Sequence, residues 1–185
     1  TKHYAIESFE RYEADATTVS PYMGLESVMP FLANGNCGIY VLCKTSNTGS
    51  DVIQNVLVSK NSKQKVIVPL YEYIAEIFVG FDVGNQIGLV VGGNCIDELQ
   101  TIHRRFPSTP LLLPGIGSQG GKIEEVTSII DNYDENIEAK NSIEKHNNNL
   151  INVSRSVIYA STGKDWKEAA RKKARTFNLN LGSGM

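Results

Sequence analysis

A glycine-rich turn in the second half of the sequence is the first candidate for chemistry. The turn reads Gly115-Ile116-Gly117-Ser118-Gln119-Gly120-Gly121 and lies between an apolar strand predicted at Leu111–Leu113 and a helix predicted at 122–132. Small residues let backbone N–H groups approach an anion closely, and a helix N-terminus adds positive potential. Gln119 adds an amide donor. The turn is therefore a candidate phosphate site, although turns of this composition also simply end strands.

A second candidate follows the next strand, predicted at 150–153. Ser154 and Arg155 come directly after it in the run Asn152-Val153-Ser154-Arg155. The guanidinium of arginine carries a fixed charge and a planar fork of donors that suits bidentate phosphate binding. Taken alone, an arginine such as Arg155 is more often a surface ion-pair residue than a phosphate ligand.

A third candidate follows the apolar run Gly38–Cys43. Lys44-Thr45-Ser46-Asn47 comes directly after that strand, so Thr45 and Ser46 would stand at its carboxyl end. Hydroxyls and exposed backbone groups at the end of a strand can form hydrogen bonds with the polar edge of a flat ring. The alternative is an ordinary strand-ending turn, in which Ser, Thr and Asn are common.

Metal and disulfide chemistry find little support in the residue spacing. Cys37, Cys43 and Cys95 form no C-x-x-C pair, and the three histidines lie far apart without an H-E-x-x-H pattern. We expect no metal, no cofactor and no disulfide, and we interpret the cysteines as small buried residues in a reducing compartment.

The elements that must position these residues alternate regularly. Continuous apolar or β-branched runs predict strands, and segments of helical periodicity predict helices between them. The predicted strands are 16–19, 38–43, 87–91, 111–113 and 150–153; the predicted helices are 4–13, 25–32, 70–78, 96–106, 122–132 and 166–177. Residues 44–65 are mostly polar and are predicted as loop and irregular structure.

This alternation predicts an α/β fold with a parallel sheet, because strands that are apolar along their length are typical of sheets covered on both faces. Two architectures fit: an open doubly wound sheet, or part of a (β/α)8 TIM barrel. A complete barrel needs about 250 residues. If the chain belongs to a barrel, we expect it to supply about strands 4–8 and their helices.

The barrel interpretation and the phosphate interpretation support each other. In (β/α) barrels, phosphate is commonly bound between the loops after strands seven and eight. Counting back from the C-terminus makes Leu111–Leu113 strand seven and residues 150–153 strand eight. The glycine turn and Arg155 then occupy the expected positions.

The composition of the chain limits the kinds of partner that we expect it to bind. The 185 residues hold 18 Lys and Arg against 20 Asp and Glu, for a net charge of −2, which does not suit binding to the nucleic-acid backbone. No apolar run approaches the roughly 20 residues of a membrane helix, and no hydrophobic signal segment opens the chain. We expect neither nucleic acid nor membrane as a partner and a cytoplasmic or organelle-matrix location.

The domain organisation follows from the predicted strands and helices of the barrel interpretation. Residues 1–181 are predicted to form the C-terminal portion of a single (β/α) barrel domain, with a polar surface insert at 134–149 and a flexible tail at 182–185. The basic residues of the last predicted helix are interpreted as a solvated face.

Five sequence blocks form an ordered set along the chain. They are Asp15-Ala16-Thr17-Thr18-Val19-Ser20-Pro21-Tyr22-Met23-Gly24, Val41-Leu42-Cys43-Lys44-Thr45-Ser46-Asn47, Gly88-Leu89-Val90-Val91-Gly92, Leu113-Pro114-Gly115-Ile116-Gly117-Ser118-Gln119-Gly120-Gly121 and Ile151-Asn152-Val153-Ser154-Arg155. In this order the blocks resemble the orotidine 5'-monophosphate decarboxylase family. The pattern is similar to the branch found in some bacteria and certain parasitic eukaryotes.

The resemblance implies a barrel homodimer that decarboxylates orotidine 5'-monophosphate to UMP without metal or cofactor, in de novo pyrimidine synthesis. It implies that Gln119 and Arg155 bind the 5'-phosphate, helped by backbone N–H groups around Ser154. It further implies that Thr45 and Ser46 contact the pyrimidine and that Pro114 helps wall an apolar pocket beside the departing carboxylate.

One family feature is missing from the sequence. The family's reaction is carried by an Asp-x-Lys-x-x-Asp segment and a further lysine, and no such segment occurs in these residues. We expect strands one to three and the catalytic charges to lie upstream of Thr1, so that no catalytic residue is assigned in this chain.

Two other functions remain open on the residues alone. One is a noncatalytic phosphate- or nucleotide-binding module with an open five-strand sheet. The other is a different barrel enzyme that acts on a phosphorylated small molecule. The Lys44–Asn47 stretch distinguishes this second alternative, because an enzyme that acts on a sugar phosphate needs no residues that contact a pyrimidine.

Overall fold

The computed structural model describes residues 1–33, 35–60, 66–82, 84–131 and 149–182. Nearly all of the insert predicted at 134–149, and the last three residues of the predicted tail, lie outside these ranges. Gly182 belongs to the final helix rather than to a tail.

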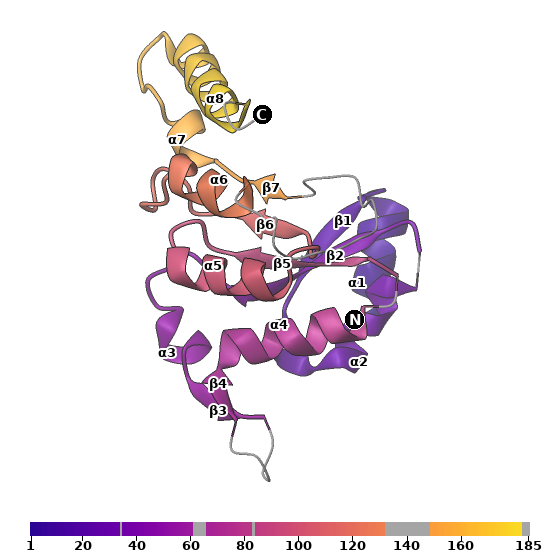
Figure 1. Cartoon of the computed structure of the whole chain (residues 1–185). Coiled ribbons are helices and arrows are strands. Elements are labelled where there is room, and N and C mark those ends of the chain that lie inside the picture. Colours follow the sequence, from indigo (N-terminus) through magenta and orange to yellow (C-terminus); the bar gives the residue numbers. More distant parts are fainter. Residues whose placement is uncertain (34, 61–65, 83, 132–148, 183–185) are drawn as a thin grey trace.

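A five-stranded parallel sheet forms the centre of the molecule (Figure 1). Its strands stand in the order β1-β2-β5-β6-β7, and each is parallel to its neighbour. Their bounds are β1 Ala16–Val19, β2 Gly38–Lys44, β5 Ile87–Val91, β6 Leu111–Leu113 and β7 Leu150–Ile151. The parallel α/β sheet predicted from the apolar runs is thus confirmed.

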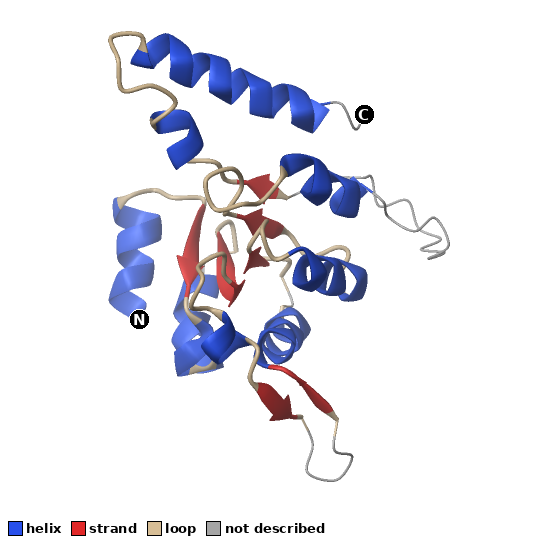
Figure 2. Ribbon diagram, turned by 90° about the vertical axis from the view of Figure 1, so that its left-hand side faces the viewer, coloured by secondary structure: helices blue, strands red, loops and turns tan. Residues whose placement is uncertain are grey.

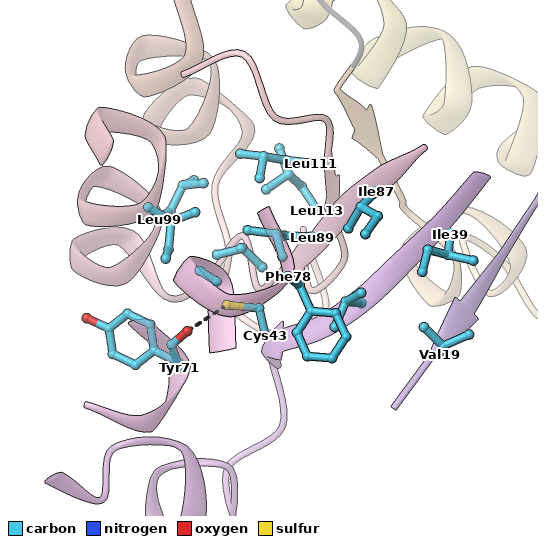
Figure 3. Close-up of a cluster of buried hydrophobic side chains, with 14 of the residues drawn as sticks. Val19, Ile39, Cys43, Tyr71, Phe78, Ile87, Leu89, Leu99, Leu111 and Leu113 are labelled. Carbon is cyan, nitrogen blue, oxygen red and sulfur yellow. Dashed lines mark hydrogen bonds between the residues drawn. The ribbon is translucent and has the colours of Figure 1, made fainter. Parts of the chain in front are cut away.

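Three helices cover one face of this sheet. They are α4 (Leu70–Phe81), α5 (Ile96–Arg105) and α6 (Ile123–Asp131). In Figure 1 they lie one above another, and Figure 2 shows them along one side of the strands. Alternate strand residues point toward them and are at most 1% exposed: Ile39, Val41, Cys43, Ile87, Leu89, Val91, Leu111 and Leu113. Figure 3 shows Leu99 and Phe78 from the helices packed among these side chains.

Burial differs between strands in a way that the apolar runs did not predict. β5, the central strand, is buried at every residue, but β2 alternates between buried and half-buried positions as far as Leu42, and β1 is mostly exposed. The face opposite α4 and α5 is therefore covered only in part within the described residues. The alternation at β2 reflects side chains that point to opposite faces of the sheet.

Several short elements differ from the sequence-based expectation. Residues 44–65 contain a one-turn helix, α3 (Asp51–Gln54), and a strand, β3 (Leu57–Ser59), which pairs antiparallel with β4 (Ile67–Pro69). The prediction of loop and irregular structure there was wrong because these elements are too short to show periodicity. A further one-turn helix, α7 (Arg155–Ile158), was also missed.

The first predicted helix changes from α to π along its length, and the second breaks after one α-helical turn. α1 (Lys2–Ile6) continues as a π-helix, η1 (Glu7–Arg11), and a 3₁₀ turn, η2 (Pro21–Met23), follows β1. The α2 helix (Leu25–Val28) passes into a 3₁₀ segment, η3 (Met29–Leu32). Pro30 lacks the N–H that an α-helical bond would need at that point, which accounts for the second break.

The last helix, α8 (Trp166–Gly182), lies beyond α6 at the β7 end of the sheet (Figure 1). Ala169, Ala170 and Phe177 form its half-buried stripe, and its basic residues are exposed: Lys167, Arg171, Lys172, Lys173 and Arg175. This exposure agrees with a solvated basic face, and that interpretation stays a prediction. None of the helices in the described ranges is both long and apolar enough to cross a membrane.

The pairing of Tyr40 with Gly88 makes a testable contact in the sheet. The two residues are register partners, and a Cβ added at Gly88 would lie 2.6 Å from Tyr40 Cδ1 and 2.8 Å from the Pro110 carbonyl oxygen. We expect Gly88→Ala to lower the free energy of unfolding by about 1–3 kcal/mol, as overpacking does. Gly80→Ala is the control, because nothing lies within 4 Å of its added Cβ. Urea unfolding that showed equal effects for both variants would contradict this account.

His103 predicts a pH dependence of stability. The residue is 8% exposed, and neither ring nitrogen has a hydrogen-bond partner in the described part of the chain. Burial lowers the pKa of His103 below its ordinary 6.5, so the folded protein binds its proton less readily than the unfolded chain. We expect stability to fall as the pH drops below about 6.5.

The measurement for His103 is urea unfolding between pH 7.5 and 5.5. His103→Leu should flatten the fall in that window, because the leucine has no proton to bind. His3→Leu is the control, since His3 is exposed. An equally steep fall in wild type and His103→Leu would show that other groups cause it.

Candidate functional site

The carboxyl ends of neighbouring strands bring the predicted site residues to one edge of the sheet. Thr45 and Ser46 follow β2, the glycine-rich turn follows β6, and Ser154 follows β7. Parallel strands all end at the same edge, which is where α/β barrels carry their active sites. The three candidate stretches therefore share one edge, as predicted.

Two consecutive glycines after β5 tie two of these stretches together. The Gly92 N–H donates to the Lys44 carbonyl at 2.7 Å, and the Gly93 N–H donates to the Pro114 carbonyl at 2.7 Å. A Cβ at Gly92 would lie 3.0 Å from the Ser46 backbone, so the close approach needs glycine. The loops after β2 and β6 are thereby fixed against the same dipeptide.

Ser46 and Gln119 meet directly. The Ser46 hydroxyl donates to the Gln119 side-chain oxygen at 3.2 Å, across 73 positions of sequence. On the other side, the Asn94 amide donates to the Ser46 carbonyl at 3.0 Å. The structure thus joins a residue predicted for the pyrimidine with one predicted for the phosphate.

Thr45 is held on a different set of partners. Its N–H donates to the Gln54 side-chain oxygen at 2.9 Å, and the Gln54 amide donates to the Thr45 hydroxyl at 2.9 Å. The Thr45 hydroxyl also lies 2.6 Å from Asn47 Oδ1, to which it donates. Both polar groups of Thr45 are therefore fixed before any ligand arrives.

The glycine-rich turn works differently from the expectation for an anion loop. The N–H groups of Gly117, Gly120 and Gly121 donate to carbonyls of the turn itself, at 2.8, 3.0 and 3.1 Å. These three donors are committed to the fold of the turn. Gly115, Gly117 and Gly120 have positive φ, so the glycines serve to shape the backbone. The exposed Gln119 side chain remains available to contact an anion.

The turn also contacts the segment that carries Arg155. A Cβ added at Gly117 would collide with the Ser156 hydroxyl in α7. Ser154 caps this short helix with its carbonyl, which accepts from the N–H groups of Val157 and Ile158 at 3.0 Å each. Arg155 is exposed, and in the described ranges it forms no hydrogen bond with Gln119. The turn therefore lies between the Ser46 side and the Arg155 side of the site.

Pro114 begins the turn and is half-buried. Its carbonyl accepts the bond from Gly93, and the next residue, Gly115, lies so close to Ser46 that an added Cβ would be 2.6 Å from Ser46 Cβ. A hollow of about 350 Å³, lined by Met29, Phe81, Gln86 and their neighbours, lies at the opposite edge, where the strands begin. It is separate from the site described here.

The cysteines, and the side chains that could bind a metal, do not form a metal site at this edge in the described residues. Burial raises the pKa of the Cys43 thiol to about 12, and this thiol donates to the Tyr71 carbonyl at 3.2 Å. Cys43 is buried as predicted, whereas Cys37 and Cys95 are half-buried, and all three are free. Over the described stretches of the chain, no three His, Cys, Asp or Glu side chains are grouped as a metal site would require.

Three residues near the site were missed by reasoning from the sequence. They are Gln54 and Asn94, whose side chains bond to Thr45 and Ser46, and Lys44, whose ammonium donates to Asn55 beside Gln54. The available signal was weak for Gln54 and Asn94. For Lys44 it was clearer, because a lysine that ends an otherwise apolar strand, directly before a candidate site, is a buried-charge candidate.

A parallel sheet that gathers its candidate site residues in the loops at its carboxyl edge defines an α/β protein of the class that binds ligands at that edge. The family model described as "Orotidine 5'-phosphate decarboxylase / HUMPS family" matches residues 1–172, and the chain belongs to this family. The predicted resemblance is confirmed.

Two bacterial relatives are each 42% identical to the chain. One is the orotidine 5'-phosphate decarboxylase of Herpetosiphon aurantiacus, matched over 175 residues; the other is that of Bordetella pertussis, matched over 176 residues. Each match covers 94% of this chain and 58% of the relative. The chain thus spans less than two thirds of the length of these relatives.

Solved structures show the same fold. The UMP synthase of Leishmania donovani matches with a TM-score of 0.74 at 31% identity, over 97% of this chain and 36% of that one. The OMP decarboxylase of the same organism matches with a TM-score of 0.71 at 29% identity, over 97% and 62%. The (β/α)8 TIM barrel is therefore the fold to which this five-stranded sheet belongs. The assignment to strands 4–8 of that barrel stays a prediction.

The contact between Gly115 and Ser46 gives a prediction about the site's construction. Gly115→Ala introduces a Cβ at a positive φ of 91° and against Ser46, whereas Gly120→Ala has a φ of 96° with nothing within 4 Å. The backbone strain is about 1–2 kcal/mol in both variants. We expect Gly115→Ala to lose at least about 1 kcal/mol more in urea unfolding, because it also overpacks the site. Equal losses would mean that Ser46 does not pack on the turn.

Proposed function

We propose that this chain is the phosphate- and pyrimidine-binding part of an orotidine 5'-monophosphate decarboxylase, which forms UMP in pyrimidine synthesis. The observation that carries the proposal is the hydrogen bond between Ser46 and Gln119 at the carboxyl edge. This bond joins Ser46, a candidate contact of the pyrimidine ring, to Gln119, a candidate contact of the phosphate. Family membership and the bacterial relatives' printed activity support the same substrate.

The residues have distinct proposed roles. Gln119 and Arg155 bind the 5'-phosphate, with backbone N–H groups near Ser154 as further donors. Thr45 and Ser46 contact the pyrimidine, and Pro114 walls the apolar space beside the departing carboxylate. The exposure of the Gln119 and Arg155 side chains supports their assignment to the phosphate.

In this reaction, the residues that bind the substrate differ from those that act when the bond to the carboxylate breaks. Loss of CO2 leaves an electron pair on the ring carbon, and a lysine ammonium must stabilise and protonate that carbanion. The Asp-x-Lys-x-x-Asp segment that the family uses for this step is not among these residues. Phosphate binding far from the reacting carbon contributes free energy that positioned charges convert into rate. In this proposal the chain supplies that binding free energy.

We propose further that the active protein is a homodimer in the cytoplasm. Tyr22 and Met23, which follow β1 at the carboxyl edge, are 91% and 71% exposed and offer apolar surface to a second copy. The three free thiols support a reducing compartment. Neither the reaction nor the fold requires a metal or cofactor in this proposal.

The direct test is decarboxylation of orotidine 5'-monophosphate by the protein at its full natural length, followed by loss of substrate absorbance. We expect turnover that UMP inhibits. A protein that neither turns over the substrate nor binds UMP would overturn the proposal. Equal binding of UMP and ribose 5-phosphate would instead favour an enzyme for another phosphorylated molecule.

The phosphate assignment predicts a selective effect at Arg155. We expect Arg155→Ala to weaken UMP binding by about 1.5–3 kcal/mol, the usual loss for a hydrogen bond to a charged group, which is roughly 10- to 150-fold in Kd. Uridine, which has no phosphate, should bind unchanged. Calorimetric titration measures both.

Arg104→Ala is the matched control. Arg104 is also exposed, but it lies at the end of α5, near the edge where the strands begin. It should leave both affinities unchanged. If Arg155→Ala weakened UMP and uridine equally, Arg155 would not be a phosphate ligand.

A further inference from the structure

A helix of a single turn holds one of the proposed pyrimidine contacts. α3 spans only Asp51–Gln54, yet Gln54 accepts from the Thr45 N–H and donates to the Thr45 hydroxyl, which itself donates to Asn47. Helix nucleation is unfavourable, so a segment this short is not stable by itself. Something outside α3 must hold it in place for Gln54 to position Thr45.

The ammonium group of Lys44 holds α3 at three points. It donates to the Asn55 side-chain oxygen at 3.1 Å and to the Ser50 hydroxyl at 3.5 Å, and it forms an ion pair with Asp51. These three residues bracket α3 from its N-cap to its C-cap. One charge therefore binds both ends of the turn.

Lys44 is itself anchored on the other side. Its ammonium lies 3.6 Å from Glu98 Oε1 in α5, and the Glu98 side chain is 22% exposed. The Lys44 side chain is 1% exposed. Lys44 therefore connects α3 to a long helix of the packed core.

The strand departs from regular geometry to place this lysine. The pairing of β2 with β5 shifts register between Leu42 and Lys44. Without the shift, alternation would send the Lys44 side chain to the same face as Tyr40 and Leu42, away from the helices. With the shift, Cys43 and Lys44 are both buried. Such irregularities are known to redirect side chains next to active sites.

Stability alone does not account for a buried lysine here. Burying a charge is costly, and well-packed apolar residues often replace a buried ion pair without loss of stability. The contacts of Lys44 converge instead on the one-turn helix that orients Thr45. A role in positioning explains the residue type and the register shift together.

We propose that Lys44 is a positioning residue for the pyrimidine subsite, acting through α3 and Gln54 on Thr45 and its neighbour Ser46. The inference rests on the proposed function, because it assumes that Thr45 and Ser46 contact a pyrimidine. Lys44 touches no ligand in this account. Replacing Lys44 should therefore weaken the contacts to the pyrimidine and leave the contacts to the phosphate unchanged.

The test compares two ligands that share a phosphate and differ in the base. Binding of UMP and of ribose 5-phosphate is measured for the protein at its full natural length and for Lys44→Met. We expect UMP to bind about tenfold more weakly, while the affinity for ribose 5-phosphate stays the same. Lys44→Arg, which keeps the charge, should recover part of the loss.

Two further variants keep the test decisive. Gln54→Leu removes both bonds to Thr45 without disturbing a buried charge, and it should show the same selective loss if Lys44→Met fails to fold. Lys60→Met is the control, because Lys60 forms its ion pair with Glu76, away from α3. It should change neither affinity.

The outcomes separate the two proposals. Equal weakening of both ligands by Lys44→Met and Gln54→Leu would show a general structural role and overturn the inference. Unchanged UMP binding in both variants would overturn it as well. If the unmodified protein binds UMP no better than ribose 5-phosphate, the proposed function itself fails, and the positioning role fails with it.

Discussion

The two N–H groups of Gly92 and Gly93 are the interaction on which the site depends. They donate in opposite directions, to the carbonyls of Lys44 and Pro114, and so fix the loops after β2 and β6 to the end of the central strand. Only glycine allows both approaches at this closeness. Because β5 is buried along its whole length, these bonds transmit the rigidity of the core to the residues proposed to bind the ligand.

The site combines rigid backbone with exposed side chains. In the turn after β6, glycine N–H groups close the loop on itself, which leaves Gln119 exposed at its tip. Thr45 is held by Gln54, and Ser46 is bonded to both Asn94 and Gln119. A ligand would meet groups whose orientation is already determined, which reduces the entropy lost on binding.

Much of the fold and of the site was predictable because local signals agree with the global arrangement. The strands from Ala16–Val19 to Leu111–Leu113 are short apolar runs with helices between them, and parallel pairing then forces the loops to one edge. Ser46, Gln119 and Arg155 follow from that rule. The supporting residues do not, because α3 exists through contacts of Lys44 with residues that show no periodicity. The antiparallel pair β3 and β4 was missed for the same reason.

The order of the strands in the sheet is also their order along the chain. Each new strand adds to an edge that the preceding strands have already formed, and no strand has to insert between two others. A nascent chain leaving the ribosome can therefore assemble this sheet progressively, with the central strand in place before the turn after β6 is synthesised. Vectorial synthesis would then complete the candidate site in steps: the loop after β2 is fixed once Gly92 follows β5, and the turn after β6 is added to a β5 that is already in place.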